Sequence, residues 1–187
     1  MNILSYTHEE FAETITRFHN YAAPGVVLGG YMVDLAIKKL PENTMYDAIS
    51  ETKSCLPDAI QILTPCTIGN GWLKVYDLNL YALSLFDKYS GNGVRVFIDS
   101  EKISDWQEIK NWLYKLKPKA EQDSNLLNSQ IKEAGSNLCS YHTVKIKPDL
   151  LEKKHKGEIR DCPQCKEPYP IEDGPTCRKC QGNGPYL

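Results

Sequence analysis

The chain from residue 59 to residue 71 reads Ala-Ile-Gln-Ile-Leu-Thr-Pro-Cys-Thr-Ile-Gly-Asn-Gly. Its first half is an apolar run with one polar break, which suits a buried strand or one side of a short helix, and periodicity does not choose between them. Its second half differs, because Pro65 removes a backbone donor while Gly69 and Gly71 admit positive φ. We therefore expect a tight turn that leaves the core at this point.

This turn would carry three polar side chains on a short piece of chain. Cys66 supplies a thiol, Thr67 a hydroxyl and Asn70 an amide, all beside backbone N–H groups. Such a set suits the floor of a pocket that holds a polar ligand or a metal, but a glycine turn whose small residues merely pack closely has the same composition. Both interpretations stay open on this stretch alone.

The first helix of the chain is predicted from a capping box at residues 7–10. Phe11, Ile15 and Phe18 fall on one face of this helix, which we expect to end near residue 20. His19 lies one position beyond these core residues and could point along the edge of the same face. A lone histidine in such a place is more often a packed or hydrogen-bonded residue than a ligand.

Periodicity and turn residues predict the other elements in the order helix 26–40, strand 45–52, helix 57–63, strand 72–77, strand 83–87, strand 94–98, helix 104–116, helix 121–134 and strand 139–147. Ser104 is the expected cap of its helix, and the helix at 121–134 looks solvated because it is polar. Ser-Gly-Asn-Gly at residues 90–93 predicts a hairpin turn with positive φ at Gly93. The pattern as a whole indicates an α+β fold with helices packed on an antiparallel sheet.

Composition sets limits on the class of protein. The chain has 187 residues, 41% of them hydrophobic and 25% charged, so it can bury one good core and leave a short appendage. Its formal net charge of −2 gives no basic field, and nucleic acid is not the expected partner. Since no apolar run reaches the roughly 20 residues of a membrane span, we expect a soluble, cytoplasmic protein.

The strongest chemical signal is at the C-terminal end. Two Cys-x-x-Cys pairs, Cys162 with Cys165 and Cys177 with Cys180, are separated by eleven residues. Such pairs supply the four thiolates of a closed tetrahedral zinc site, and a segment this short and rich in proline needs the metal to fold. A redox dithiol pair or a rubredoxin-like iron site are the alternatives.

We therefore predict two domains, an α+β domain at residues 1–157 and a zinc module at residues 158–187. Residues 150–160 are charge-rich and read as a linker or short helix between them, and the basic cluster at residues 153–156 reads as a solvated face. The module itself has four basic residues, which are offset by five acidic ones, so an RNA-binding face is not favoured.

Most of the chain resembles the E-subunit family of formylmethanofuran dehydrogenase, which occurs beside molybdenum or tungsten enzymes. The resemblance rests on five features in this order: Phe-His at 18–19 with Pro-Gly at 24–25, the run 58–71, Asp77 with Ala82, the run 91–96, and the four-cysteine module. It implies an α+β fold similar to the C-terminal domain of glyceraldehyde-3-phosphate dehydrogenase, paired as a homodimer, and it implies little settled biochemistry.

The chain also departs from the pattern of that family. Tyr21 and Ala23 stand where the family tends to have a histidine and a cysteine, and Asn79-Leu80 stands where it has Gly-Lys. Cys55 matches a family cysteine and is retained, as is Cys66. With His19 they leave at most a partial metal site, because a stable zinc site usually needs three or four protein ligands.

Three functions follow as hypotheses. The leading one is a metal-binding accessory or small-ligand-binding protein, associated with a molybdenum or tungsten oxidoreductase that performs the catalysis. The second is a metal- or thiol-dependent enzyme that uses Cys66 and His19, which we expect to converge. In it Cys66, activated by nearby backbone N–H groups and by His19, acts as a thiolate nucleophile or as a metal ligand. The third is a zinc-module adaptor for protein or RNA, whose contacts would be Arg160, Lys166, Arg178 and Lys179.

Overall fold

The computed structural model of the protein describes residues 2–152 and 157–186. The chain forms two compact units, Met1–Leu151 and Glu152–Leu187, and each is described by itself. The sequence placed the boundary at residues 157 and 158, a few residues further along the chain. The predicted basic cluster at residues 153–156 lies outside the described residues.

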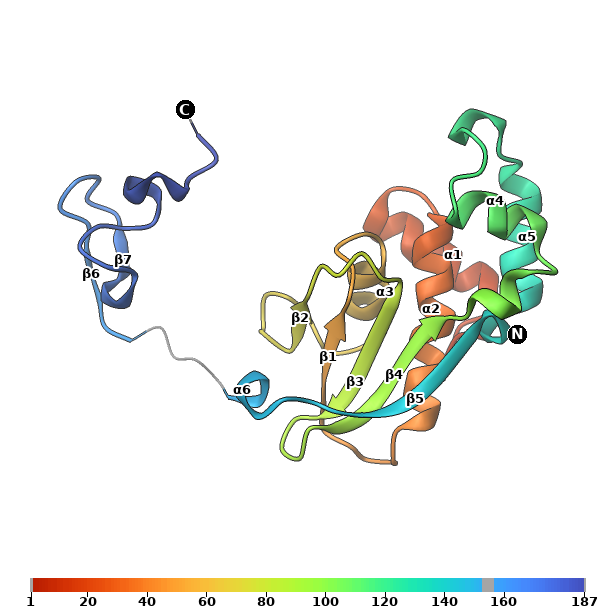
Figure 1. The fold of residues 1–187 in the computed structure, drawn as a ribbon, viewed down its shortest axis with the longest axis horizontal. Coiled ribbons are helices and arrows are strands. Elements are labelled where there is room, and N and C mark those ends of the chain that lie inside the picture. Colours follow the sequence, from red (N-terminus) through yellow and green to blue (C-terminus); the bar gives the residue numbers. More distant parts are fainter. Residues whose placement is uncertain (1, 153–156, 187) are drawn as a thin grey trace. The chain divides into compact units, whose positions relative to one another are not determined.

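The larger unit contains six α-helices and five strands among its described residues (Figure 1). The helices are α1 (His8–His19), α2 (Pro24–Lys39), α3 (Leu56–Leu63), α4 (Gln107–Leu113), α5 (Ser124–Ala134) and α6 (Pro148–Leu151). The strands are β1 (Tyr46–Ser50), β2 (Leu73–Val75), β3 (Ala82–Asp87), β4 (Asn92–Ile98) and β5 (Cys139–Lys145). Single helical turns occur at Ser100–Ile103, Lys119–Glu121 and Gly135–Leu138. The predicted α+β class is confirmed.

The five strands form one sheet in the order β2-β1-β3-β4-β5. β1 pairs with β3, β3 with β4, and β4 with β5, all antiparallel. β2 instead runs parallel to β1, with Ala48 opposite Leu73. The expectation of a wholly antiparallel sheet is therefore corrected at this edge, because α3 crosses over between β1 and β2 and returns the chain in the same direction.

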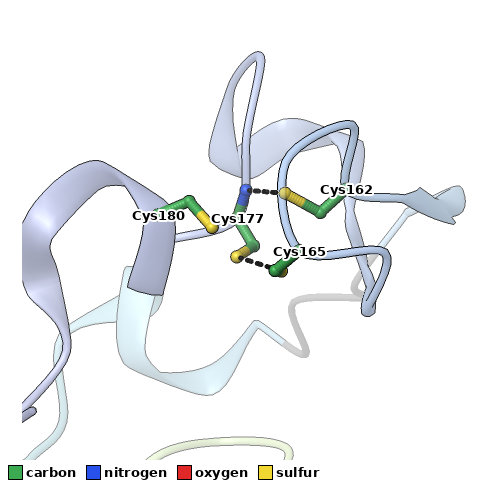
Figure 2. A group of neighbouring side chains, drawn as sticks. All are labelled: Cys162, Cys165, Cys177 and Cys180. Atoms are coloured by element: carbon green, nitrogen blue, oxygen red, sulfur yellow. Dashed lines mark hydrogen bonds between the residues drawn. The ribbon is translucent and has the colours of Figure 1, made fainter.

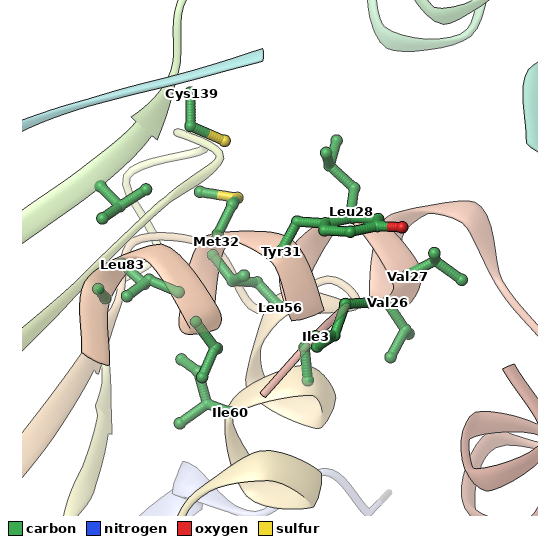
Figure 3. Close-up of a cluster of buried hydrophobic side chains, with 14 of the residues drawn as sticks. Ile3, Val26, Val27, Leu28, Tyr31, Met32, Leu56, Ile60, Leu83 and Cys139 are labelled. Carbon is green, nitrogen blue, oxygen red and sulfur yellow. The ribbon is translucent and has the colours of Figure 1, made fainter. Parts of the chain in front are cut away.

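Helix α2 lies at the centre of the core and contacts β3 and β4. Leu28, Tyr31 and Met32 on this helix are fully buried against Leu56 and Ile60 of α3 and other apolar side chains (Figure 3). The helix begins at Pro24, in the first turn where proline is tolerated.

The capping box of α1 is confirmed: the Thr7 side chain accepts from the Glu10 N–H while the Glu10 carboxylate accepts from the Thr7 N–H. Phe11 and Ile15 are buried as expected. Phe18, predicted to share their face, is 57% exposed. Only the first two turns of α1 therefore have core beneath them.

The stretch at residues 59–71 resolves into the end of a helix and a turn. α3 ends at Leu63, and the turn that follows is closed by the Asn70 side chain, whose Oδ1 accepts from the Thr67 N–H at 3.1 Å. The Asn70 amide donates to the Pro65 carbonyl at 2.8 Å. Gly71 has φ 75°, so the predicted turn and one of its glycines are confirmed.

The hairpin between β3 and β4 is present, but its glycines have other roles than predicted. Gly91 has the positive φ, at 73°. Gly93 lies in β4 opposite Phe86, and a Cβ added there would approach the Leu85 carbonyl oxygen to 2.3 Å. The assignment of positive φ to Gly93 was wrong, and this glycine is instead required for close packing of two strands.

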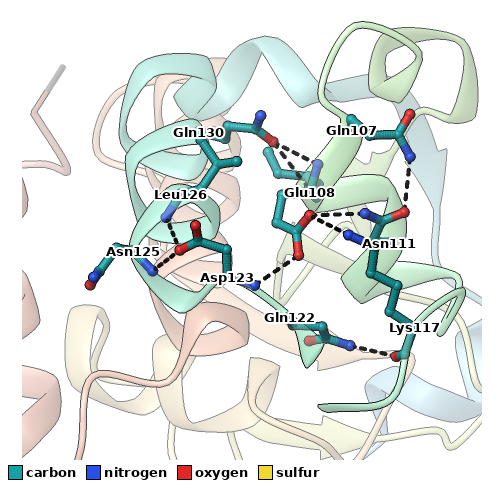
Figure 4. A network of polar contacts seen from close by, with 10 residues as sticks. Gln107, Glu108, Asn111, Lys117, Gln122, Asp123, Asn125, Leu126 and Gln130 are labelled. Carbon is teal, nitrogen blue, oxygen red and sulfur yellow. Dashed lines mark hydrogen bonds and ion pairs between the residues drawn. The ribbon is translucent and has the colours of Figure 1, made fainter. Parts of the chain in front are cut away.

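Helices α4 and α5 are joined by polar contacts, and the predicted cap of α4 is absent (Figure 4). Ser104 does not cap α4, since its hydroxyl donates to the Glu101 carbonyl; the α4 N–H groups of Glu108 and Ile109 donate instead to Gln130 of α5. α5 begins three residues later than predicted.

The side chain of Asp123 caps α5 by accepting from the N–H groups of Asn125 and Leu126. The helix also buries Leu127, Ile131 and Ala134. One face of α5 is therefore buried, and the helix is not wholly solvated as predicted.

The smaller unit has almost no hydrophobic core. Its strands β6 (Ile159–Asp161) and β7 (Pro168–Pro170) pair antiparallel, with short helical turns at Ile171–Asp173 and Lys179–Asn183. Its described buried apolar residues are Cys162, Tyr169 and Cys177. Within the described residues, no helix is long and apolar enough to cross a membrane.

Candidate functional site: a four-cysteine cluster and a cavity beside Cys55

Figure 2 shows the four cysteines of the smaller unit, which point toward one another from two turns of the chain. Their sulfur atoms all lie within 4.8 Å of one another, and Cys165 Sγ is 3.6 Å from Cys177 Sγ. In a tetrahedral zinc site with Zn–S distances of about 2.3 Å, sulfur atoms are separated by about 3.8 Å. The spacing therefore fits a zinc ion, as the sequence predicted.

The electrostatics of this cluster also favour a cation. The Cys177 N–H donates to Cys162 Sγ at 3.5 Å, and this hydrogen bond is the main reason that the pKa of Cys162 is lowered to about 6. Burial raises the pKa of Cys180 to about 12. Sulfurs so close cannot all be thiolates unless a positive ion lies among them, and zinc would supply that charge.

All four basic residues that could make this unit an adaptor have partners inside it. Arg160 donates to the Tyr169 hydroxyl and to the Gly174 carbonyl, and Arg178 pairs with Asp173. The other two are Lys179, paired with Glu167 at 2.6 Å, and Lys166, which donates to the Pro163 carbonyl at 3.0 Å.

In the larger unit, His19 lies beside a carboxylate that sequence reasoning missed. Its Nδ1 is 2.7 Å from Asp58 Oδ2, and its ring is 5.2 Å from that of Tyr21. Asp58 is in the first turn of α3, where a carboxylate is favoured by the helix dipole. The only signal for this pair in the sequence was Pro57-Asp58 as a helix start.

Cys55 immediately precedes α3 with φ 58° and ψ −47°, an unfavourable backbone conformation for a residue with a side chain. It packs against Gly25, where an added Cβ would lie 2.9 Å from the Cys55 Sγ. The Tyr81 hydroxyl donates to the Gly25 carbonyl in the same place. Burial, followed by the nearby Asp58 carboxylate, raises the pKa of the Cys55 thiol.

Cys66 follows the opposite end of α3 from Asp58 and Cys55. Residues 58 and 63, near the two ends of α3, are themselves about 8 Å apart along the helix axis, and Cys66 lies three residues beyond. The Cys66 thiol is fully buried and donates to the Tyr46 carbonyl, and burial raises its pKa to about 11.

The contacts of His19 and those of Cys66 thus involve different residues, and none of them joins the two. Thr67 and Asn70 bond mainly within their own turn. Among the described residues, only the four C-terminal cysteines gather three or more ligand atoms suited to a metal ion.

A cavity of about 930 Å³ opens beside Cys55. The start of α2 forms one wall, with Tyr21 and Ala23, the two positions where the sequence departs from the family pattern. The opposite wall comes from α4, α5 and the loop between them. It contributes Trp112, Leu127 and three lysines, Lys115, Lys117 and Lys119. Sequence reasoning missed these lysines, because a charged loop is usually just solvated.

The fold and the cysteine cluster define an α+β protein with a C-terminal zinc-finger unit. Residues 18–147 match the family described as FmdE, Molybdenum formylmethanofuran dehydrogenase operon, and residues 153–187 match the FmdE treble clef zinc finger. The chain belongs to the FmdE family, as the sequence resemblance indicated.

The proteins similar to this chain include a solved structure and a curated protein. A crystal structure of a tungsten formylmethanofuran dehydrogenase FmdE-like protein from Syntrophus aciditrophicus is 59% identical. It has a TM-score of 0.93, with 100% of this chain and 98% of that chain covered. A probable S-adenosyl-L-methionine-binding protein from Archaeoglobus fulgidus is 28% identical over an alignment that is 187 positions long. The alignment covers 89% of this chain and 51% of that protein. The chain thus spans about half the length of this relative.

Proposed function

We propose that this chain is a zinc-dependent accessory protein that binds a small ligand in the cavity beside Cys55 and acts with a molybdenum or tungsten oxidoreductase. Zinc held by Cys162, Cys165, Cys177 and Cys180 folds the C-terminal unit. The chain itself performs no catalysis, and its partner enzyme does. Pairing of two copies, which the family resemblance implies, is part of this proposal.

The lining of the cavity carries the proposal. The described residues that line it include one thiol, and none of them is histidine, aspartate or glutamate. That thiol, Cys55, has a raised pKa and is therefore protonated at neutral pH. A cavity of this size with apolar and cationic walls, but without an activated nucleophile and its base, is suited to binding rather than to covalent catalysis.

The enzyme alternative requires a reactive Cys66. Because that thiol is fully buried and its pKa is raised to about 11, it is a neutral core residue at neutral pH. The adaptor alternative requires free basic side chains on the zinc unit, whereas all four of those named pair within the unit. Both observations favour the accessory function over its competitors.

The similar proteins support the two finer parts of the proposal. The family description and the name of the protein in the similar crystal structure refer to molybdenum and tungsten formylmethanofuran dehydrogenase. The name of the Archaeoglobus relative assigns that protein a small-molecule ligand. Because the match covers 89% of this chain, it includes most of the α+β unit of this chain. We carry over the general property, a small ligand, and not the identity of that ligand.

Sedimentation of the zinc-loaded protein with a purified tungsten formylmethanofuran dehydrogenase tests the association. We expect the chain alone to sediment as a dimer and, when mixed, to move with the enzyme complex. Independent sedimentation of the two at micromolar concentrations would refute the accessory function. Turnover of formylmethanofuran by the chain alone would refute the absence of catalysis.

A further inference from the structure

The lysines of the cavity come from a single loop, residues 114–123, that is anchored to a buried carboxylate. Glu108 on α4 is 4% exposed, and its Oε1 accepts from the Asp123 N–H at 3.0 Å where the loop ends (Figure 4). Its Oε2 accepts from Asn111 at 2.9 Å and lies 3.6 Å from Lys117 Nζ. Gln122 donates to the Lys117 carbonyl, which closes the loop on itself. Glu108 therefore holds the loop at its end, Asp123, and at its middle, Lys117.

The charge of this cavity is positive on one side only. Lys115, Lys117 and Lys119 line it, and of the described lining residues none is acidic. Lys117 forms an ion pair with Glu108, while Lys115 and Lys119 form no ion pair with any residue in the described parts of the chain. Two lysines without an ion-pair partner that line one cavity attract an anion.

The facing wall adds to this field. α2 begins here, its N-cap residue Ala23 makes no side-chain cap, and its first turn has no acidic residue. The positive end of the dipole of a 16-residue helix thus lies at the cavity with no cap or acidic residue from its own first turn.

The remainder of the lining is aromatic and apolar. Tyr21 and Trp112 line the cavity together with Ala22, Ala23 and Leu127. Tyr21 is 53% exposed, so its ring is available as a surface for stacking. An inorganic anion would leave this apolar lining unused, whereas a ligand with a flat ring and an anionic end would use both parts.

We propose that the cavity beside Cys55 binds a mononucleotide, with the base against Tyr21 and Trp112 and the phosphate toward Lys115 and Lys119. Base–aromatic stacking and lysine–phosphate pairing are the two interactions by which proteins commonly hold such ligands. The inference rests on the proposed ligand-binding function of the same cavity and names the chemical class of its ligand.

Isothermal titration of the full, zinc-loaded chain with adenosine 5′-monophosphate tests the proposal. We expect saturable binding, and at least about tenfold weaker binding of adenosine and of inorganic phosphate, because each lacks one of the two interactions. No binding of the nucleotide at millimolar concentration overturns the proposal. Equal affinity for inorganic phosphate, which would mean an adventitious ion only, also overturns it.

Variants localise the binding. The double variant Lys115→Gln, Lys119→Gln should weaken nucleotide binding about tenfold or more, since two charge-assisted contacts are lost. Lys147→Gln removes an exposed positive charge that does not line the cavity and should leave affinity unchanged. Equal weakening by this control variant would show only general electrostatic attraction and would overturn the proposed site.

Cys55 provides a second readout in the wild-type protein. With the four C-terminal cysteines occupied by zinc, Cys55 is the one partly exposed thiol of the described residues, because Cys66 and Cys139 are buried. Bound nucleotide should slow alkylation of Cys55 by iodoacetamide, and an unchanged rate at saturation would contradict binding in this cavity. If nucleotide binding fails while the chain still sediments with the dehydrogenase, the nucleotide proposal alone is overturned.

Discussion

The two units of this protein are stabilised by different means. The larger unit buries Leu28, Tyr31, Met32 and many other apolar side chains around α2. The smaller unit buries two cysteines and one tyrosine among its described residues, and its four sulfurs lie within 4.8 Å of one another. Hydrophobic burial grows with chain length, so a unit of this size cannot rely on it.

The two units should therefore respond differently to mutation and to removal of metal. The stability of the larger unit should depend on packing volume and on backbone fit, and should be indifferent to metal. Folding of the smaller unit should depend on metal binding, which contributes about 10 kcal/mol or more in sites of this type. Variants in each unit should therefore affect different measurements.

The largest effect is expected from Cys162→Ser. Loss of one of four ligands should release the zinc and make residues beyond 157 sensitive to protease, while the larger unit keeps its thermal melting transition. Limited proteolysis followed by mass spectrometry measures this. Cys55→Ser is the matched control and should retain the metal, because Cys55 lies outside the cluster. Equal resistance of the Cys162→Ser tail and the wild-type tail would contradict the assignment.

Core truncation in the larger unit should come next. Leu28 is fully buried, so Leu28→Ala should lower the free energy of unfolding by about 2 to 5 kcal/mol in chemical denaturation, with zinc content unchanged. Leu78→Ala serves as control, because Leu78 is 58% exposed and its loss should cost about 0.5 kcal/mol or less. Loss of zinc from Leu28→Ala would break the separation of the two units.

A smaller effect is expected from Gly93→Ala. Its new Cβ would lie 2.3 Å from the Leu85 carbonyl oxygen and 2.7 Å from Phe86 Cα, and backbone atoms in a paired strand cannot move cheaply. We expect a loss of about 1 to 3 kcal/mol in the free energy of unfolding. Gly69→Ala is the control, since its Cβ would meet only Thr67 Oγ1 at 4.0 Å. Equal stability of the two variants would argue against the close strand approach.

The smallest effect concerns the pH dependence of the larger unit. The hydrogen bond from Asn111 holds the pKa of Glu108 below its ordinary value of 4.5. A depressed folded pKa adds stability above that ordinary value, and this stability is lost as pH falls through the folded pKa. Glu108→Gln should therefore be less stable than wild type at pH 7, and the difference should shrink below about pH 4.

Denaturant titrations at several pH values measure this difference. Glu133→Gln, an exposed position on α5, should leave the pH profile unchanged. If Glu108→Gln leaves the profile unchanged as well, Glu108 does not anchor the loop through its charge.

The sequence predicted best where local chemistry alone decides the structure. The spacing of Cys162, Cys165, Cys177 and Cys180 was enough to place four sulfurs together, because each Cys-x-x-Cys turn is a local structure. The capping box at Thr7 and the proline at the start of α2 likewise marked helix ends from a few residues.

It failed where distant parts of the chain decide the outcome. The burial of Phe18 depends on what lies beneath the last turn of α1, and the role of Gly93 depends on how closely β3 approaches. The pairing of His19 with Asp58 joins residues 39 positions apart. The cavity was missed for the same reason, because its lysines and Tyr21 meet only after folding.

Elemental analysis of the purified chain shows whether a single zinc ion, held by the four C-terminal cysteines, is the metal of this protein. We expect one zinc per chain in the wild type and none in Cys162→Ser, since the described residues gather one set of metal ligands. Two zinc ions per chain, or one retained by Cys162→Ser, would contradict this expectation.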